Sequence, residues 1–264
     1  MWTRGFSERA WERGCRETVA RAFAAVPYYR EMWAVAGARL DEPEATPVTR
    51  LDTVLDRLYP LDAPYVRRRE EPLWVGEPAE LFEALELTGA HRRDLPLFEV
   101  RTSLLDWERI GPGGGRYHVV LSASAEVADP ELRQGQLRAL REARDPGLLA
   151  DAAQLTELDG GTAGARVFLR RSPAELAEDG ATAGVTEVVH DERLGYLGAR
   201  HRGCGRTHLN WRRVHARTGG SGPLFTMTRR RRPTLANIAL PGTTHLTVGR
   251  CAEHGTPTLD GGPR

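Results

Sequence analysis

The sequence predicts an α/β (α+β) fold with a helical N-terminal region, a mixed central sheet with flanking helices, and a strand-rich C-terminal region. Three observations lead to this prediction. Apolar residues between positions 7 and 37 recur near a 3.6-residue period, which indicates helix. Helix and strand signals then alternate from 79 to 190, as they do in chains that cover a sheet with helices. Beyond Leu194, short strand patterns separated by turns dominate.

The N-terminal region begins with a helical pattern that has clear limits. Ser7 can cap its start, Pro27 interrupts it, and Gly37 ends it. A second, short helix is expected over 49–58, because the chain reaches Pro60 directly afterwards. The first part of the chain is therefore expected to be largely helical.

The middle of the chain carries two strong helix-start signals. Asp129 followed by Pro130 places a capping acid before a proline at the first helical position. Ser172-Pro173-Ala174-Glu175 has the form of a capping box. The helices expected in this part are 79–87, 129–144 and 148–158. The strands expected from here to the C-terminus are 95–105, 117–122, 165–169, 186–190, 209–216, 224–228, 235–240 and 245–248.

The shift from helix-rich to strand-rich sequence near residue 185 is the one plausible internal boundary. It divides the chain into a helix-rich α/β region, 1–185, and a strand-rich region, 186–264. At 264 residues the chain can bury a sizeable core, and we expect the two regions to form one compact unit.

Composition excludes several classes of function. A net charge of +1 gives no global attraction to nucleic acid or membrane, and no apolar run is long enough to span a bilayer. The charged N-terminus lacks the apolar core of a signal peptide, so a cytoplasmic location is expected. The sequence contains no lysine, which removes Schiff-base chemistry, a lysine general base and any phosphate-loop lysine.

Two cysteine–histidine pairs in the C-terminal region point to a metal. Cys204 is followed by His208, and Cys251 by His254, which together supply the ligands of a four-coordinate zinc site. Glycines surround both cysteines and allow the tight turns that a metal site needs. Four protein ligands leave no position for water, so a structural Zn²⁺ that closes the C-terminal region is expected. Cys15 then has no partner for a disulfide.

An arginine-rich passage is the densest positive patch in the sequence. Residues 229–232 are all arginine, and Arg212 and Arg213 lie nearby in sequence. Because guanidinium groups suit carboxylates and phosphates, Arg212, Arg213 and Arg230 are candidates for anion binding. A small carboxylate, an acyl thioester or an acidic carrier protein fits this patch better than nucleic acid does. A charged surface loop is the alternative.

A third candidate is the triplet His190-Asp191-Glu192, which could act as a general acid–base cluster. Adjacent residues at a strand end point in different directions, however, so a solvated turn is the preferred interpretation. The sequence has no G-x-S-x-G motif for a serine hydrolase. It therefore identifies no catalytic residue.

Two passages of the sequence are similar to a known family. The N-terminal passage is Val26-Pro27-Tyr28-Tyr29-Arg30, followed by Gly37 and by residues 47–52. The C-terminal passage contains Leu194-Gly195-Tyr196, the Cys204/His208 segment, Phe225-Thr226, Pro233 and the turn at 251–254. They resemble the phenylacetate–CoA ligase branch of the adenylate-forming enzymes. Several members of that family carry zinc at the corresponding places, so the resemblance also implies that Cys204, His208, Cys251 and His254 bind zinc.

The sequence also departs from this family in ways that concern its chemistry. It has no SSGTTG-type phosphate loop over 60–95, no Tyr-Gly-x-Thr-Glu motif and no mobile C-terminal domain with its catalytic lysine, and 121–125 lacks the glycines of a phosphate loop. ATP is therefore not expected as a cofactor, and the chain is expected to be a shortened relative of acyl- or aryl-CoA ligases.

Such a protein would handle a carboxylate, an acyl thioester or a carrier-bound intermediate in a biosynthetic pathway, without ordinary ATP adenylation. One alternative is a non-catalytic, zinc-stabilised partner of a ligase or carrier protein. The other is a zinc-dependent hydrolase or lyase. The expected partners are a small carboxylate or acyl thioester, or an acyl carrier protein, and homo-oligomer formation is compatible with the sequence.

Overall fold

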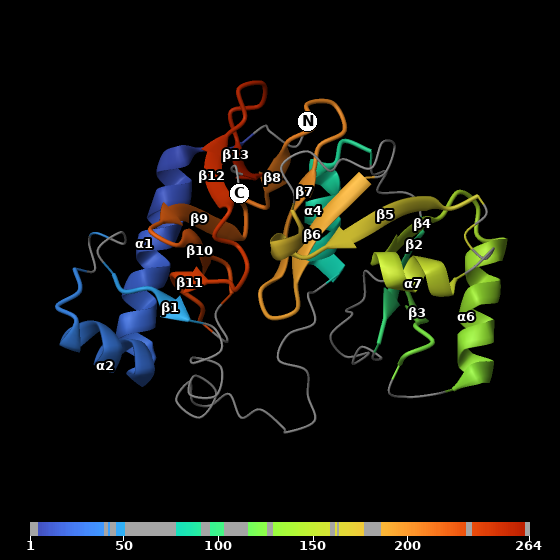
Figure 1. The fold of residues 1–264 in the computed structure, drawn as a ribbon, viewed down its shortest axis with the longest axis horizontal. Coiled ribbons are helices and arrows are strands. Elements are labelled where there is room, and N and C mark those ends of the chain that lie inside the picture. The colour runs from blue at the N-terminus through green and yellow to red at the C-terminus, as the bar shows by residue number, and fades with distance from the viewer. Residues whose placement is uncertain are drawn as a thin grey trace. The chain divides into compact units, whose positions relative to one another are not determined.

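The computed structural model describes residues 5–39, 42, 46–50, 78–90, 96–102, 116–125, 129–158, 162, 164–176, 186–230 and 234–261. Helices together with a large mixed sheet confirm the predicted α/β class (Figure 1). The chain divides into two compact units, one of Met1–Trp74, Pro173–Gly180 and Arg206–Arg264, the other of Val75–Ser172 and Ala181–Gly205. The division into regions 1–185 and 186–264, which rests on a change from helix-rich to strand-rich patterns in the sequence, stays a prediction.

The second unit contains a six-stranded mixed sheet. Its strands are β2 (Leu97–Arg101), β3 (Tyr117–Leu121), β4 (Gly147–Ala150), β5 (Arg166–Arg171), β6 (Thr186–Asp191) and β7 (Gly195–Arg200). They lie in the order β7-β6-β5-β4-β2-β3, in which β2 to β6 are parallel and β7 is antiparallel to β6. Since β3 lies on one side of β2 and β4 on the other, the strand order reverses at β2.

Helices of the second unit cover this sheet. They are α4 (Pro78–Leu87), α6 (Pro130–Glu142) and α7 (Ala152–Glu157). As predicted, Asp129 caps α6 by accepting a hydrogen bond from the backbone N–H of Leu132. Apolar side chains of the strands, of α6 and of the end of α7 form a common core of Phe98, Val100, Val120, Leu140, Leu148, Ala150 and Leu158. Burial of this apolar face is what holds the helices on the sheet.

The first unit begins with two helices that confirm the N-terminal prediction. α1 (Glu8–Ala25) starts at Ser7, whose hydroxyl accepts a hydrogen bond from the backbone N–H of Ala10. α2 (Pro27–Val35) has Pro27 at its first position, where a missing N–H costs nothing. In the helices of the described residues, no segment combines the length and apolar character needed to cross a membrane.

Apart from these helices, the described residues of the first unit form mainly short strands. One sheet has the order β1-β11-β10-β9 and contains β1 (Thr49–Arg50), β9 (Val214–Gly219), β10 (Gly222–Met227) and β11 (Ile238–Ala239). In addition, β13 (Pro257–Gly261) pairs with both β12 (Leu246–Arg250) and β8 (Thr207–Leu209). The capping-box sequence 172–175, where a helix start was expected, contains a 3₁₀ turn, Pro173–Glu175.

Three predicted elements are wrong in the described residues. Thr49–Arg50, expected to open a helix, is strand β1, which pairs with β11. The expected helix 148–158 is a strand followed by a short helix, because Gly147–Ala150 is a buried apolar run that pairs on both sides and Asp151 caps a new start. The expected strand 209–216 is interrupted, because the carbonyl of Asn210 accepts hydrogen bonds from Arg213 and Val214 and closes a turn. The rest of the expected helix 49–58 after β1, and the turn 111–115, lie outside the described residues.

Candidate functional site

Two turns of the same design carry the candidate metal ligands. The first is His201-Arg-Gly-Cys204-Gly205, and the second is Cys251-Ala-Glu-His254-Gly255. In each turn the carbonyl of the first residue accepts a hydrogen bond from the N–H of the final glycine, over 2.9 Å and 2.8 Å. Both glycines have positive φ, +69° and +67°, which other residues rarely adopt. Each turn therefore presents a sulfur and an imidazole three residues apart.

His208 adds a further imidazole from strand β8. Its side chain is fully buried, and its Nδ1 lies 2.8 Å from the Thr256 hydroxyl. Its ring also meets the ring of His254 edge-on, with 5.2 Å between the centroids. Because a hydrogen bond to one ring nitrogen fixes the orientation of the other, Thr256 can act as the outer partner of a metal-binding histidine.

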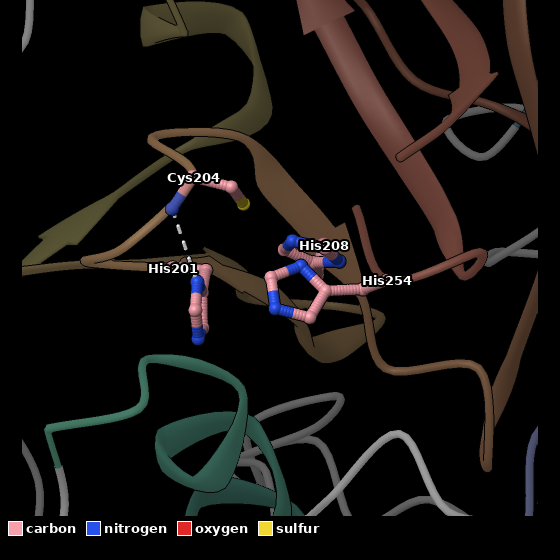
Figure 2. Close-up of side chains that lie close together, drawn as sticks. All are labelled: His201, Cys204, His208 and His254. Carbon is pink, nitrogen blue, oxygen red and sulfur yellow. Dashed lines mark hydrogen bonds between the residues drawn. The ribbon is translucent and has the colours of Figure 1, made fainter. Parts of the chain in front are cut away.

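The side chains of His201, Cys204, His208 and His254 come together in one group (Figure 2). One potential ligand atom from each lies within 4.8 Å of the others. In a tetrahedral zinc site with nitrogen and sulfur ligands, the ligand atoms are separated by roughly 3.3–3.8 Å. The residues present therefore fit a zinc ion after a small contraction of the group.

Cys251, the remaining ligand expected from the sequence, lies beside this group. Its side chain is buried, and its Sγ is 3.4 Å from Nδ1 of His254. The structure thus groups four donor side chains, and Cys251 lies next to one of them, His254.

His201 is not among the metal ligands predicted from the sequence. The signal was the repeated turn pattern, since H-x-x-C-G is followed later by C-x-x-H-G. The His201 ring packs closely against two glycines: an added Cβ would lie 2.8 Å from its Nε2 at Gly89 and 3.1 Å from its Cε1 at Gly203. Nδ1 accepts a hydrogen bond from the Cys204 N–H over 3.3 Å. His201 therefore stabilises the turn that presents the Cys204 thiol.

The arginines proposed for anion binding have different environments. The guanidinium of Arg212 lies 5.2 Å from the centre of the Trp211 ring, within the range of a cation–π interaction. Arg213 is half-buried, whereas Arg230 is buried and its carbonyl accepts a hydrogen bond from Arg21. Anion binding by these three residues stays a prediction.

The triplet at the end of β6 does not form a joint acid–base group. Asp191 accepts hydrogen bonds from the backbone N–H groups of Arg193 and Leu194, each over 2.9 Å, and so closes the β6–β7 turn. His190 instead packs on the Tyr196 ring, with 4.6 Å between the centroids. The imidazole and the carboxylate therefore have separate roles.

Comparison with known proteins reveals a likeness at the level of structure. No protein-family model matches the sequence, and no curated protein matches it. The fold is similar to that of 2-hydroxyisobutyryl-CoA ligase in complex with 2-HIB-AMP and CoA, with a TM-score of 0.63 and 12% identity over 96% of this chain and 68% of that chain. The same ligase in the postadenylation state with R3-HIB-AMP gives a TM-score of 0.63 and 12% identity over 97% of this chain and 66% of that chain. The chain shares the fold of about two thirds of an acyl-CoA ligase.

Proposed function

We propose that the protein is a relative of the acyl- and aryl-CoA ligases of the adenylate-forming superfamily, related to their phenylacetate–CoA ligase branch. It would handle a carboxylate, an acyl thioester or a carrier-bound intermediate in a biosynthetic pathway. The observation that supports this most is the fold, which nearly the whole chain shares with a ligase solved with an acyl adenylate and CoA. A small acyl ligand is the partner that this likeness favours.

The proposal excludes ordinary ATP adenylation. The segment after β3, which contains two serines, already engages a carboxylate of its own chain: Glu157 accepts hydrogen bonds from the Ser122 hydroxyl at 2.8 Å and from the Ala123 N–H at 3.0 Å. A phosphate-binding loop needs its backbone N–H groups for the ligand, and a carboxylate at this place repels phosphate. The sequence also contains no lysine to contact the phosphates.

The proposed cofactor is a structural Zn²⁺ held by Cys204, His208, Cys251 and His254. Zinc would link the two turns and add folding free energy, on the order of 10 kcal/mol in small zinc modules. We favour Cys251 over His201 as the fourth ligand because thiolates bind zinc strongly and Nδ1 of His201 already accepts the Cys204 N–H. His201 would then act as an outer partner that orients the first turn.

The experiment measures separately whether the chain binds acyl compounds and whether it adenylates carboxylic acids. Isothermal titration calorimetry with short-chain acyl-CoA thioesters and with an acyl carrier protein should show binding to at least one of them. ATP–pyrophosphate exchange with a panel of carboxylic acids should stay at background. Exchange well above background would show that the chain adenylates its substrate, and the absence of every acyl or carrier interaction would contradict the proposed function.

A non-catalytic, zinc-stabilised partner of a ligase or carrier protein is the second candidate. A group of four donor side chains, which can fill a tetrahedral zinc, favours it over a zinc hydrolase or lyase, since a catalytic zinc keeps one position open for water. Co-purification with a full-length ligase, without measurable binding of any acyl thioester, would select this candidate.

A further inference from the structure

Two serine hydroxyls and a carboxylate are linked by hydrogen bonds at the end of strand β3, separate from the metal donors. The Ser122 hydroxyl donates to Oε2 of Glu157 over 2.8 Å, and Oγ of Ser122 and Oγ of Ser124 are 2.9 Å apart. Ser122 is buried, whereas Ser124 and Glu157 are exposed. This relay, Ser124–Ser122–Glu157, therefore leads from a solvent-accessible hydroxyl through a buried one to a carboxylate.

The number of hydrogens fixes the direction of the relay. Ser122 has a single hydroxyl hydrogen, which it donates to Glu157, because an ionised carboxylate only accepts. The Ser122 oxygen must then accept from the Ser124 hydroxyl, and it also accepts the Ser124 backbone N–H over 3.2 Å. The lone pairs of the Ser124 oxygen have no hydrogen-bond partner among the described residues. A hydroxyl with free lone pairs and a path for its proton to a base has what a serine nucleophile requires.

Contacts from neighbouring elements hold the turn that carries both serines. The Ser122 N–H donates over 2.8 Å to the carbonyl of Arg101, the last residue of β2. Directly before it, the Leu121 N–H donates to the Gln136 side chain of α6 at 2.9 Å. The Leu121 carbonyl accepts from Nε of Arg133, also of α6, at 2.9 Å. The start of the turn is thus fixed on rigid elements, as the support of a reacting group should be.

The relay lies at the carboxyl-terminal edge of the parallel strands. Strands β3 and β4 lie on either side of β2. Ser122 directly follows β3, and Glu157 ends α7, the helix that follows β4. The hydrogen bond between them therefore lies beside the carboxyl end of β2, where the strand order reverses. Open α/β sheets bind small molecules at such a position.

A second carboxylate on these strands, that of Glu99 in β2, is not available for proton transfer. The residue is buried, and both of its oxygens are engaged by arginine and tyrosine side chains, namely Arg101, Tyr117, Arg170 and Tyr196. Its charge is thus used inside the sheet. Glu157 is the carboxylate that reaches a serine.

We infer that Ser124 is the nucleophile of an acyl transfer, and that Ser122 and Glu157 take up its proton. The inference rests on the proposed function, which supplies an acyl thioester as the substrate class. Oγ of Ser124 attacks the carbonyl carbon, and its proton passes to Ser122 while the proton of Ser122 passes to Glu157. The C–S bond breaks, and the departing thiolate takes a proton from Ser122, which Glu157 replaces. The products are an acyl ester of Ser124 and a free thiol, so the step consumes neither ATP nor a redox partner.

The experiment treats the full chain with acetyl-CoA, benzoyl-CoA and, as an activated ester without CoA, 4-nitrophenyl acetate. The wild type should consume at least one thioester, measured by the loss of thioester absorbance, and should carry the acyl group on Ser124, located by peptide mass spectrometry. Ser124→Ala should lose both. Thr156→Ala is the matched control and should react like the wild type, because the Thr156 hydroxyl precedes Glu157 on α7 and donates to the Ala152 carbonyl, outside the relay.

Glu157→Gln tests the proton path. Glutamine can still accept the Ser122 hydroxyl but takes up no proton, so the acylation rate should fall about 100-fold or more while KM stays unchanged. Ser122 and Glu157 act on the substrate only through Ser124, and a solvent isotope measurement separates this role from a structural one. In mixtures of water and heavy water the wild-type rate should depend on the deuterium fraction along a curve, since two protons move. The curvature should disappear in Glu157→Gln.

Circular dichroism establishes folding of each variant. If Ser124→Ala does not fold, the position of the acyl group in the wild type and the rate of Glu157→Gln decide. No acylation by any of the three compounds, an acyl group that persists in Ser124→Ala, or a Glu157→Gln variant as fast as the wild type would overturn the inference. Binding of a thioester in calorimetry without acylation would overturn it while the proposed function stands. Acylation of Ser124 by 4-nitrophenyl acetate, in a chain that binds no acyl thioester or carrier, would leave the nucleophile standing and remove the proposed function alone.

Discussion

Sγ of Cys251 lies 3.4 Å from Nδ1 of His254, within a turn that also closes through Gly255. This separation corresponds to one edge of a zinc tetrahedron, which is roughly 3.3–3.8 Å long for sulfur and nitrogen ligands. Because the ring of His254 also meets the ring of His208, the turn brings a thiol and two imidazoles together. Cys251 and His254, which the sequence spacing suggests as zinc ligands, therefore lie at a separation that a shared zinc ion requires.

The first prediction concerns the identity of the zinc ligands. Cys204→Ser and Cys251→Ser should each purify with far less than one zinc per chain. His201→Gln is the control, because His201 is proposed as an outer partner: it should keep full occupancy under saturating zinc and lose about tenfold in affinity. Metal analysis by mass spectrometry gives the occupancy.

Cobalt substitution gives an independent measurement of the same ligand set. The thiolate-to-cobalt absorption of the wild type should fall to about half in either serine variant that still binds metal, as expected for two thiolate ligands. An undiminished band in Cys251→Ser, together with metal loss in His201→Gln, would instead assign His201 as the fourth ligand.

The second prediction concerns metal removal. Chelation of zinc should lower the melting temperature of the wild type strongly, since metal-binding free energy is part of the folding free energy of such sites. The same treatment should leave the melting temperature of Cys204→Ser unchanged, because that variant has no metal to lose. Equal melting curves of the wild type with and without chelator would show that zinc does not stabilise the fold.

The third prediction tests the tight turn between β9 and β10. Gly222 has a φ of +110°, and a Cβ at this position would lie 2.7 Å from the Thr243 carbonyl oxygen. Gly222→Ala should therefore destabilise the protein by about 1–3 kcal/mol, measured by chemical unfolding. Gly220→Ala in the same turn is the control, since nothing lies within 4 Å of its added Cβ. Similar losses for both variants would contradict this account.

A fourth prediction tests the cap of α7. Asp151 accepts a hydrogen bond from the Gln154 N–H at 2.8 Å, and the Gln154 side chain accepts one from the Asp151 N–H at 3.1 Å. Asp151→Ala should cost about 0.5–2 kcal/mol of unfolding free energy, whereas Asp151→Asn should stay close to the wild type because asparagine caps equally well. If the asparagine variant lost as much as the alanine variant, the contribution would come from charge and not from capping.

The sequence predicted elements best where a local signal decided the structure. Ser7 and Asp129 cap helices as expected, because a cap depends on a few neighbouring residues. Residues 148–150 were misjudged because a short buried apolar run suits a strand as well as a helix, and pairing with distant strands decides between them.

Prediction of the candidate site is limited in the same way, because contacts between residues far apart in the sequence determine part of its geometry. The pairs Cys204/His208 and Cys251/His254 are visible as spacings in the sequence. The approach of His201 to Cys204 depends on the room left by Gly89, more than a hundred residues earlier. The surroundings of Glu99 were not foreseen either, because its partners come from four different strands and no short motif joins them.

The last prediction is a pH dependence that arises from His190. Burial lowers its pKa from 6.5 to about 3, with Arg170 and Arg101 adding to the effect and Glu99 opposing it. The unfolded chain therefore takes up a proton at this histidine near pH 6.5, whereas the folded chain does not. The stabilisation is fully present above pH 6.5 and is lost as the pH falls toward 3, at up to about 1.4 kcal/mol per pH unit.

His190→Gln should flatten this part of the stability curve, measured by urea unfolding between about pH 7 and pH 4. Glu99 stays ionised throughout this range, because Arg101 and Arg170 hold its pKa near 2 despite burial. The pKa values of His118 and His215 are also lowered, but both residues are present in the two proteins, so the difference between the curves isolates His190. Parallel curves would mean that the His190 ring is protonated as freely in the folded chain as in the unfolded one.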